Sequence, residues 1–345
     1  MLPILTKNNH FRFGFDALDF SKRKNANQAW QVSYGQCARD PLPFKEECIE
    51  TAHLIRRSTK KSLWVCFSGG IDSEVVARSF LAAGIDFNCA ILRFPEQLNE
   101  HDIHWAREFC ESCSVPYRYF DIDPREFWRT NALAYAEMGQ CCSIGMTLLF
   151  WLAEQIPGYP IFGSGECHLV DDVEKIIPRR KLGAHWLGGL ALHTEADKEI
   201  LLYLDKNFGR PRGEPKKFRW HLSEKENIAG LYRFFMALGK EGAPGFFQYT
   251  PEIMASFLND PTVVGLTDNL LINSPKGTHT SEDLKHDIYS SYWPIERRKK
   301  ATGFEKLNLS NEFVQLQKRL FWSFGDASDI FYTSVADLKK YWAIL

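Results

Sequence analysis

Apolar residues in the first half of the chain are concentrated in short segments, at residues 63–67, 86–94, 116–121 and 159–163, and polar residues interrupt the second and third of them. Helical spacing of apolar positions separates the first three runs, at residues 74–81 and 99–113. Near-continuous apolar runs are typical of strands buried on both faces, and strands that alternate with helices form parallel sheets with right-handed crossovers. The sequence therefore predicts an α/β fold with a doubly wound parallel sheet.

The remaining pattern divides the chain into four parts. Residues 1–60 are interpreted as an N-terminal appendage, with short strands near 11–15 and 31–34 and a helix at 44–57. Residues 61–172 form the α/β core, which also contains helical stretches at 128–137 and 143–155. Residues 173–223, punctuated by proline, glycine and basic clusters, are an irregular insertion or lid. Residues 224–345 form a C-terminal helical region that completes the domain, with helices expected at 224–238, 251–258, 282–292, 311–321 and 334–342.

Composition excludes several classes of protein. The 345 residues are 45% hydrophobic and 25% charged, as in soluble globular proteins. The formal net charge of -1 gives no electrostatic reason to favour nucleic acid or an anionic membrane. Nine cysteines, an odd number, indicate reduced thiols, and the longest apolar run, 144–153, is half a membrane span. We therefore expect a cytoplasmic protein with no membrane partner, while nucleic acid is possible through the basic clusters but not favoured.

The first apolar run leads into the turn that carries most of the candidate chemistry. Ser68, Gly69, Gly70, Asp72 and Ser73 follow the run and precede the first helix. Glycines let successive backbone N–H groups face one hollow, and the helix N-terminus adds partial positive charge. The two hydroxyls can donate to phosphate oxygens, whereas Asp72 repels phosphate unless a divalent cation lies between them. The pattern predicts a site for a metal-bound polyphosphate.

The sequence Ser-Gly-Gly-Ile-Asp-Ser resembles the pyrophosphate loop of the N-type ATP pyrophosphatases (PP-loop proteins). A Walker loop would need lysine where this chain has Ile71. The resemblance implies an adenine nucleotide alpha hydrolase-like fold, ATP as ligand and Mg²⁺ as cofactor, with Asp72 as a metal ligand. Ligands of parallel sheets bind beyond the carboxyl ends of the strands, so Leu92 and Arg93 should flank the adenine or ribose.

A second glycine-containing turn follows the run at 159–163. Its residues Gly163, Ser164 and Gly165 should face the first loop across the sheet and help to bind the nucleotide. Ser164, Gly165 and Glu166 resemble the Ser-Gly-Glu loop of asparagine synthetases, but the family's metal-binding aspartate is missing from its expected place. The resemblance leaves Glu166 or Asp171 as substitutes for that metal ligand.

The C-terminal region extends the resemblance to the synthetase domain of asparagine synthetases. Residues 283–289, the Trp293–Pro294 break and residues 298–304 are similar to that group's lysine-containing helix, its Leu-Pro break and its Arg-x-Lys-x-Gly-Phe stretch. The resemblance makes Lys285 the catalytic lysine and Glu137 the acid that accepts a proton from an attacking amine. It runs in patches from residue 63 to 307.

The resemblance implies an ATP-dependent ligase or amidotransferase that adenylates an acceptor, releases pyrophosphate and passes the acceptor to an amine or ammonia. Family members with their own glutaminase begin with Cys after Met1, where this chain has Leu2. The first rival is sulfur transfer to a nucleobase, suggested by Cys141, Cys142 and Cys167. The second is a non-catalytic nucleotide-binding subunit of a larger assembly. The acceptor substrate and the oligomeric state stay open.

Overall fold

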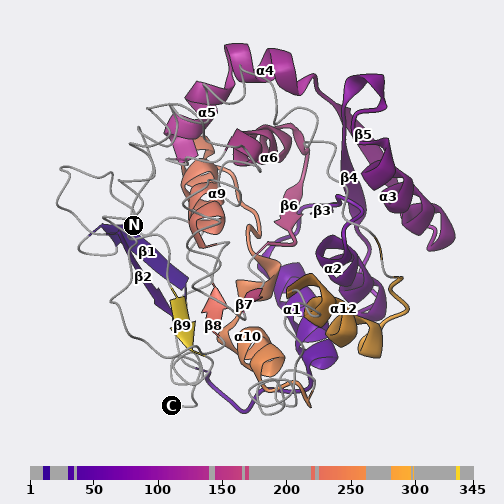
Figure 1. Ribbon diagram of the computed structural model, residues 1–345, viewed down its shortest axis with the longest axis vertical. Helices are drawn as coiled ribbons and strands as arrows, with labels where there is room; N and C mark the ends of the chain where they lie inside the picture. The colour runs from indigo at the N-terminus through magenta and orange to yellow at the C-terminus, as the bar shows by residue number, and fades with distance from the viewer. Residues whose placement is uncertain are drawn as a thin grey trace.

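A computed structural model of the chain describes residues 11–15, 30–34, 37–139, 144–164, 168–170, 219–221, 225–261, 281–296, 298 and 332–334. Its central sheet has four parallel strands in the order β5-β4-β3-β6 (Figure 1). These are β3 (Leu63–Cys66), β4 (Asn88–Arg93), β5 (Tyr117–Asp121) and β6 (Tyr159–Phe162). The predicted α/β fold with a parallel sheet is confirmed.

The strand order reverses between β3 and β6. The chain proceeds from β3 to β4 and β5 in one direction, and then places β6 on the other side of β3. In parallel sheets, ligands bind beyond the carboxyl ends of the strands at such a reversal of strand order. Both glycine turns found in the sequence follow these two strands, so the topology brings them to the same point of the sheet.

The helices between the strands differ from the predicted ones at two places. They are α2 (Ile71–Ala82), the short η2 (Pro95–Gln97), α3 (Glu100–Ser112), α4 (Pro124–Thr130), α5 (Ala132–Gly139) and α6 (Ile144–Gln155). Helix α2 begins three residues before the predicted start, so Asp72 and Ser73 lie in its first turn and not in the preceding loop. The stretch predicted as one helix at 128–137 is wrong, because α4 ends at Thr130 and a new helix begins at Ala132.

Further helices pack around the sheet on aromatic side chains. They are α1 (Phe44–Ser58), α9 (Lys225–Leu238), η3 (Phe246–Gln248), α10 (Pro251–Leu258) and α12 (Ser281–Tyr292). Figure 1 shows α1, α2 and α12 grouped together, with α5, α6 and α9 as a separate group. The Phe44 ring at the start of α1 stacks on Tyr289 of α12, with ring centroids 5.9 Å apart. Helix α1 is thereby part of the same core as the C-terminal helices, although the domain boundary near residue 60 stays a prediction.

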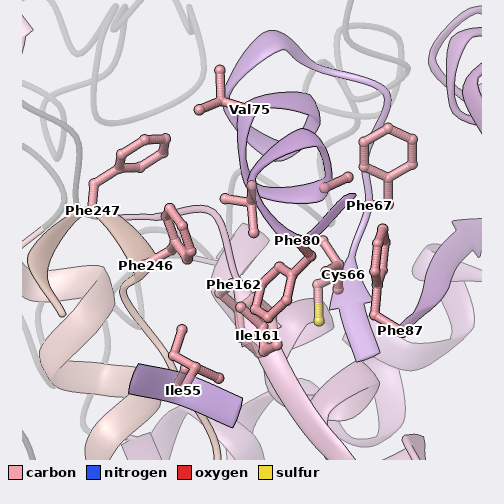
Figure 2. Close-up of a cluster of buried hydrophobic side chains, with 14 of the residues drawn as sticks. Ile55, Cys66, Phe67, Val75, Phe80, Phe87, Ile161, Phe162, Phe246 and Phe247 are labelled. Carbon is pink, nitrogen blue, oxygen red and sulfur yellow. The ribbon is translucent and has the colours of Figure 1, made fainter. Parts of the chain in front are cut away.

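The main core fills the space between these helices and the sheet (Figure 2). Phe80 of α2 lies at its centre and contacts Phe87 and Phe246, with ring centroids 5.6 and 6.1 Å apart. Burying a phenylalanine side chain contributes about 1.5–3 kcal/mol to folding. The position of α2, and of the loop that precedes it, is therefore fixed by apolar contacts on several elements.

Two smaller sheets are antiparallel. One pairs β1 (Phe11–Phe15) with β2 (Trp30–Tyr34), which confirms the strands expected there. The other joins β7 (His168–Val170), β8 (Arg219–His221) and β9 (Tyr332–Ser334), and the sequence pattern did not predict it. Ser334 closes β9, so the helix expected to start there is wrong at its first residue. The rest of that helix, the helix expected at 311–321 and most of the insertion lie outside the described residues.

Of the helices in the described ranges, none is both long enough and apolar enough to span a bilayer.

Candidate functional site

The loop between β3 and α2 packs its backbone closely against a neighbouring helix. Gly69 has φ +78°, and a Cβ atom there would lie 2.2 Å from the carbonyl oxygen of Asp102 in α3. Both the dihedral angle and the contact require glycine. Gly70 is the N-cap of α2, and no side chain caps this helix. The N-cap residue thus supplies no side-chain acceptor at the N-terminus of α2, a place that suits an anion.

The two serines of the loop form a weak hydrogen-bonded ring with its backbone. The Gly70 N–H donates to Ser68 Oγ over 3.3 Å, and Ser68 Oγ lies 3.3 Å from Ser73 Oγ. Ser73 Oγ in turn donates to the Gly70 carbonyl oxygen over 2.9 Å. Two of these three distances are at the long limit for hydrogen bonds, so oxygens of an anion can replace them at little cost.

The C-terminal helix α12 contributes two side chains to this loop. Lys285 Nζ donates to Asp72 Oδ2 over 2.9 Å, and the Tyr289 hydroxyl donates to Asp72 Oδ1 over 2.9 Å. The two donors are four residues apart, which places them on the same face of the helix. Lys285 is 1% exposed and Asp72 is 20% exposed. The proximity of Lys285 to the loop, which the sequence predicted, is present in the structure, while its catalytic role stays a prediction.

A second basic residue reaches the loop from beyond α12. Arg298 Nη1 donates to the Gly69 carbonyl oxygen over 2.6 Å, and Arg298 Nη2 forms an ion pair with Glu74 Oε2 over 2.5 Å. The guanidinium carbon lies 4.6 Å from the centre of the Trp105 ring. The opposite oxygen of Glu74 pairs with Arg78 over 2.6 Å.

Among the described residues, two basic side chains reach the loop directly, and each is paired with one carboxylate: Lys285 with Asp72 and Arg298 with Glu74. The partial positive charge of the α2 N-terminus adds to these charges. The arrangement suits an anion with several oxygens, which can accept from both backbone N–H groups and basic side chains.

The carboxyl end of β6 meets the first turn of α2. A Cβ atom on Gly163 would lie 3.2 Å from the Ser73 Cα atom, so the two strands' loops start side by side. Ser164 follows Gly163 at the same edge and is partly buried. Gly165, Glu166 and Asp171 lie outside the described residues, and their roles stay predictions.

The carboxyl end of β4 is held by side chains of its neighbours. The Leu92 carbonyl oxygen accepts a hydrogen bond from Asn99 Nδ2 over 3.0 Å. Arg93 turns to the adjacent strand, where its guanidinium bonds Asp121 over 2.5 and 2.9 Å and keeps the pKa of that carboxyl below its usual value. The nucleotide-binding role of Leu92 and Arg93 stays a prediction.

Glu137 is exposed on α5, in a group of helices that stands apart from α2 and α12 in Figure 1. The structure thus does not bring Glu137 to the pair of Asp72 and Lys285, and its role as a proton acceptor stays a prediction. Among the described residues, no group of three or more His, Cys, Asp or Glu side chains is arranged to hold a metal ion.

Tyr289 and Arg298 lie in the two C-terminal motifs that the sequence singled out, but neither was assigned a role, and Glu74 and Trp105 were not singled out. The spacing of four residues between Lys285 and Tyr289 was a signal for the first of them. Nothing in the local sequence indicated that Arg298 would contact Gly69, which is 229 residues away. Contacts over such separations are decided by how α12 packs.

The fold and the site together define an α/β protein with a glycine loop at the switch point of a parallel sheet and two basic residues directed to it. No protein-family model and no curated protein matches the sequence. Among solved structures, the NMN synthetase of Francisella tularensis is similar, with 16% identity and a TM-score of 0.28. The match covers 60% of this chain and 90% of the synthetase. A likeness this weak assigns neither a family nor an activity to the chain.

Proposed function

We propose that the chain binds ATP at residues 68–73 and splits it into AMP and pyrophosphate, transferring the adenylyl group to an acceptor. The pyrophosphate part would lie against the Gly69–Gly70 backbone and the N-terminus of α2. Ser68 and Ser73 would exchange their long mutual contact for phosphate oxygens. The proposal joins the motif to the geometry of the loop, and both favour the same ligand.

The pair of Lys285 and Asp72 carries this proposal. Burying an ion pair seldom stabilises a fold more than an apolar pair of the same size, so its retention favours a functional explanation. Lys285 is almost fully buried, yet its ammonium group lies at the first turn of an uncapped helix. A cation in that place can offset the charge that builds on the α-phosphate and on the departing pyrophosphate.

The described residues are compatible with a magnesium ion bound by Asp72. Magnesium takes one or two carboxylates and completes its shell with waters and phosphate oxygens, so a dense cluster of acids is not required. When bound, the ion would neutralise phosphate charge and allow Asp72 to lie near the polyphosphate. Lys285 and Tyr289 would orient the Asp72 carboxylate, since each donates to one of its oxygens.

A finer proposal is that an amine or ammonia then displaces AMP from the adenylated acceptor, as the resemblance to asparagine synthetases implies. The non-catalytic subunit is the alternative in which ATP binds without turnover. Incubating the protein with ATP, Mg²⁺ and a metabolite extract, followed by mass detection of AMP and new adenylates, separates the two. Binding of ATP with no AMP above a protein-free control would favour the subunit.

Sulfur transfer is a further alternative, and the described cysteines bear on it. Cys48, Cys66 and Cys89 are buried, and burial raises the pKa of each thiol above its usual value. A thiol that keeps its proton is a poor nucleophile and a poor sulfur carrier. These three cysteines act as core residues. Cys141, Cys142 and Cys167 lie outside the described residues, so this alternative rests on them and on the partly exposed Cys113 at the C-terminal end of α3.

Replacement of Asp72 tests the proposal. We expect the wild-type protein to bind ATP more tightly with Mg²⁺ than with EDTA, and Asp72→Asn to lose at least tenfold in affinity together with the Mg²⁺ dependence. Asp287→Asn is the matched control, because Asp287 lies two residues from Lys285 on α12 and therefore on another face of the helix, and its side chain is 39% exposed. Isothermal calorimetry measures all three proteins. Equal, Mg²⁺-dependent affinity in wild type and Asp72→Asn would refute the role of Asp72, and no ATP binding by wild type would refute the proposed function.

A further inference from the structure

Arg298 connects three elements that surround the phosphate-binding loop. Its two terminal nitrogens reach the Gly69 carbonyl oxygen and Glu74, and its guanidinium plane lies over Trp105. Its side chain is 11% exposed. A planar group held by two polar contacts and an aromatic face has little freedom to turn. The position of the Gly69 carbonyl is thus fixed by Arg298.

The orientation of that carbonyl decides where the next N–H group points. The peptide bond between Gly69 and Gly70 is planar and trans, so its C=O and N–H point in opposite directions. Two glycines flank the bond, and without an external contact the peptide plane can rotate easily. The hydrogen bond from Arg298 holds the carbonyl on one side and thereby directs the Gly70 N–H toward Ser68 and Ser73.

The need to neutralise the Glu74 carboxylate does not explain why Arg298 lies at the loop. Arg78 already pairs with Glu74, with its Nε at 2.7 Å and its Nη2 at 2.6 Å from Oε1. Arg78 also donates to the Pro294 carbonyl oxygen over 3.0 Å, so it ties α2 to the segment that follows α12. The contact that distinguishes Arg298 from Arg78 is the hydrogen bond to the Gly69 carbonyl.

We propose that Arg298 is a positioning residue, which orients the Gly69–Gly70 peptide so that the Gly70 N–H donates to the β- or γ-phosphate of the nucleotide. The inference rests on the proposed function and deepens it, because it makes the recognition of pyrophosphate depend on the hydrogen bond between Arg298 and the Gly69 carbonyl oxygen. Arg298 acts through the backbone and does not need to touch the ligand. The affinity for ligands that lack a pyrophosphate group should not change when Arg298 is replaced.

The test compares ligands that contain a pyrophosphate group, ATP and inorganic pyrophosphate, with AMP, which lacks one. Arg298→Gln and Arg298→Lys are measured beside wild type, with Arg78→Gln as the matched control that removes the other guanidinium on Glu74. We expect affinity for ATP and for inorganic pyrophosphate, both with Mg²⁺, to fall about tenfold in the Arg298 variants, the loss of one hydrogen bond to a charged group. Affinity for AMP should stay within twofold, and Arg78→Gln should resemble wild type for all three ligands.

A purely structural role for Arg298 would weaken AMP and ATP equally, and that result would overturn the inference. Unchanged ATP and pyrophosphate affinity in both Arg298 variants would also overturn it. If wild type itself binds no ATP, the proposed function fails first. If the variants do not fold, the amide proton of Gly70 in wild type gives an independent measurement. We expect its NMR signal to move downfield when pyrophosphate and Mg²⁺ are added, and an unmoved signal contradicts the inference.

Discussion

Lys285→Met separates the effect of Lys285 on chemistry from its effect on folding. Methionine keeps most of the apolar volume of lysine, so the change removes the charge without leaving a large cavity. Removing one partner of a buried ion pair costs about 3–5 kcal/mol. Asp72 keeps the Tyr289 hydroxyl and is 20% exposed, so we expect a smaller loss in the free energy of unfolding, about 2 kcal/mol.

The expected effect on turnover is larger and of a different kind. A charged donor that acts on the departing pyrophosphate supplies about 3 kcal/mol to the transition state, which is roughly a hundredfold in rate. Lys285 is proposed to stabilise the charge that builds during the reaction more than the charge already present in bound ATP. The affinity for ATP should therefore change by no more than about threefold. Turnover is measured as pyrophosphate release with the identified acceptor, and ATP affinity by calorimetry.

Lys240→Met is the matched control for this substitution. Lys240 is partly buried, whereas Lys285 is fully buried, and the Nζ of Lys240 donates to the Ile156 carbonyl oxygen over 2.6 Å, just after the end of α6. Its loss should lower stability without changing turnover. A double-mutant cycle with Asp72→Asn, followed by urea unfolding, should give a coupling of about 1 kcal/mol or more between Asp72 and Lys285. Normal turnover in Lys285→Met would refute the catalytic role, and it would favour a non-catalytic binding protein.

Two further predictions concern stability. Gly69→Ala should lower the free energy of unfolding by about 3 kcal/mol, because φ is +78° and the new Cβ would lie 2.2 Å from the Asp102 carbonyl oxygen. Gly84→Ala, where φ is +64° and nothing lies within 4 Å of the new Cβ, should cost only about 1 kcal/mol, and equal urea midpoints for the two variants would contradict the close contact with α3. Burial, with Glu252 and Glu47 nearby, raises the pKa of the Cys37 thiol from 9.0 to about 12. Between those values the unfolded thiol loses its proton and the folded one keeps it, so stability falls as the pH rises from 9. Cys37→Ala should reduce the difference between urea midpoints at pH 8 and pH 10.5, and an unchanged difference would show that Cys37 does not contribute.

The sequence by itself determined the α/β core and the loop. Apolar segments at β3, β4 and β6 indicated buried strands, and the helical spacing between the strands indicated parallel crossovers, whereas the edge strand β5 carries polar residues and is more exposed. The glycine at position 69 indicated a backbone conformation that favours glycine, and the structure gives it φ +78°. These features are local, because each depends on neighbours within a few residues. The periodicity of apolar positions or the residue type is therefore enough to predict them.

Helix boundaries were less well determined. The turn residues Asp72 and Ser73 proved to be the first turn of α2, because Gly70 serves as an N-cap without any side chain to mark it. The break between α4 and α5 carries no proline or glycine at Asn131 and was not visible in the pattern. The three-residue strands β7, β8 and β9 are too short to show alternation, and they exist through pairing over long separations.

Only the tertiary structure decided which charges meet at the loop. Lys285 lies 213 residues from Asp72, and it reaches Asp72 because Tyr289, four residues later, is packed among Phe44, Phe247 and Phe257. The motif made Lys285 a candidate, but the aromatic core places its ammonium group at the loop. Arg298 and Glu137 both lay in stretches that the resemblance had marked, yet packing brings only Arg298 to the loop, where it contacts Gly69, and leaves Glu137 exposed on α5. Local spacing can name a residue type at a site, whereas burial of distant apolar side chains determines which residues arrive there.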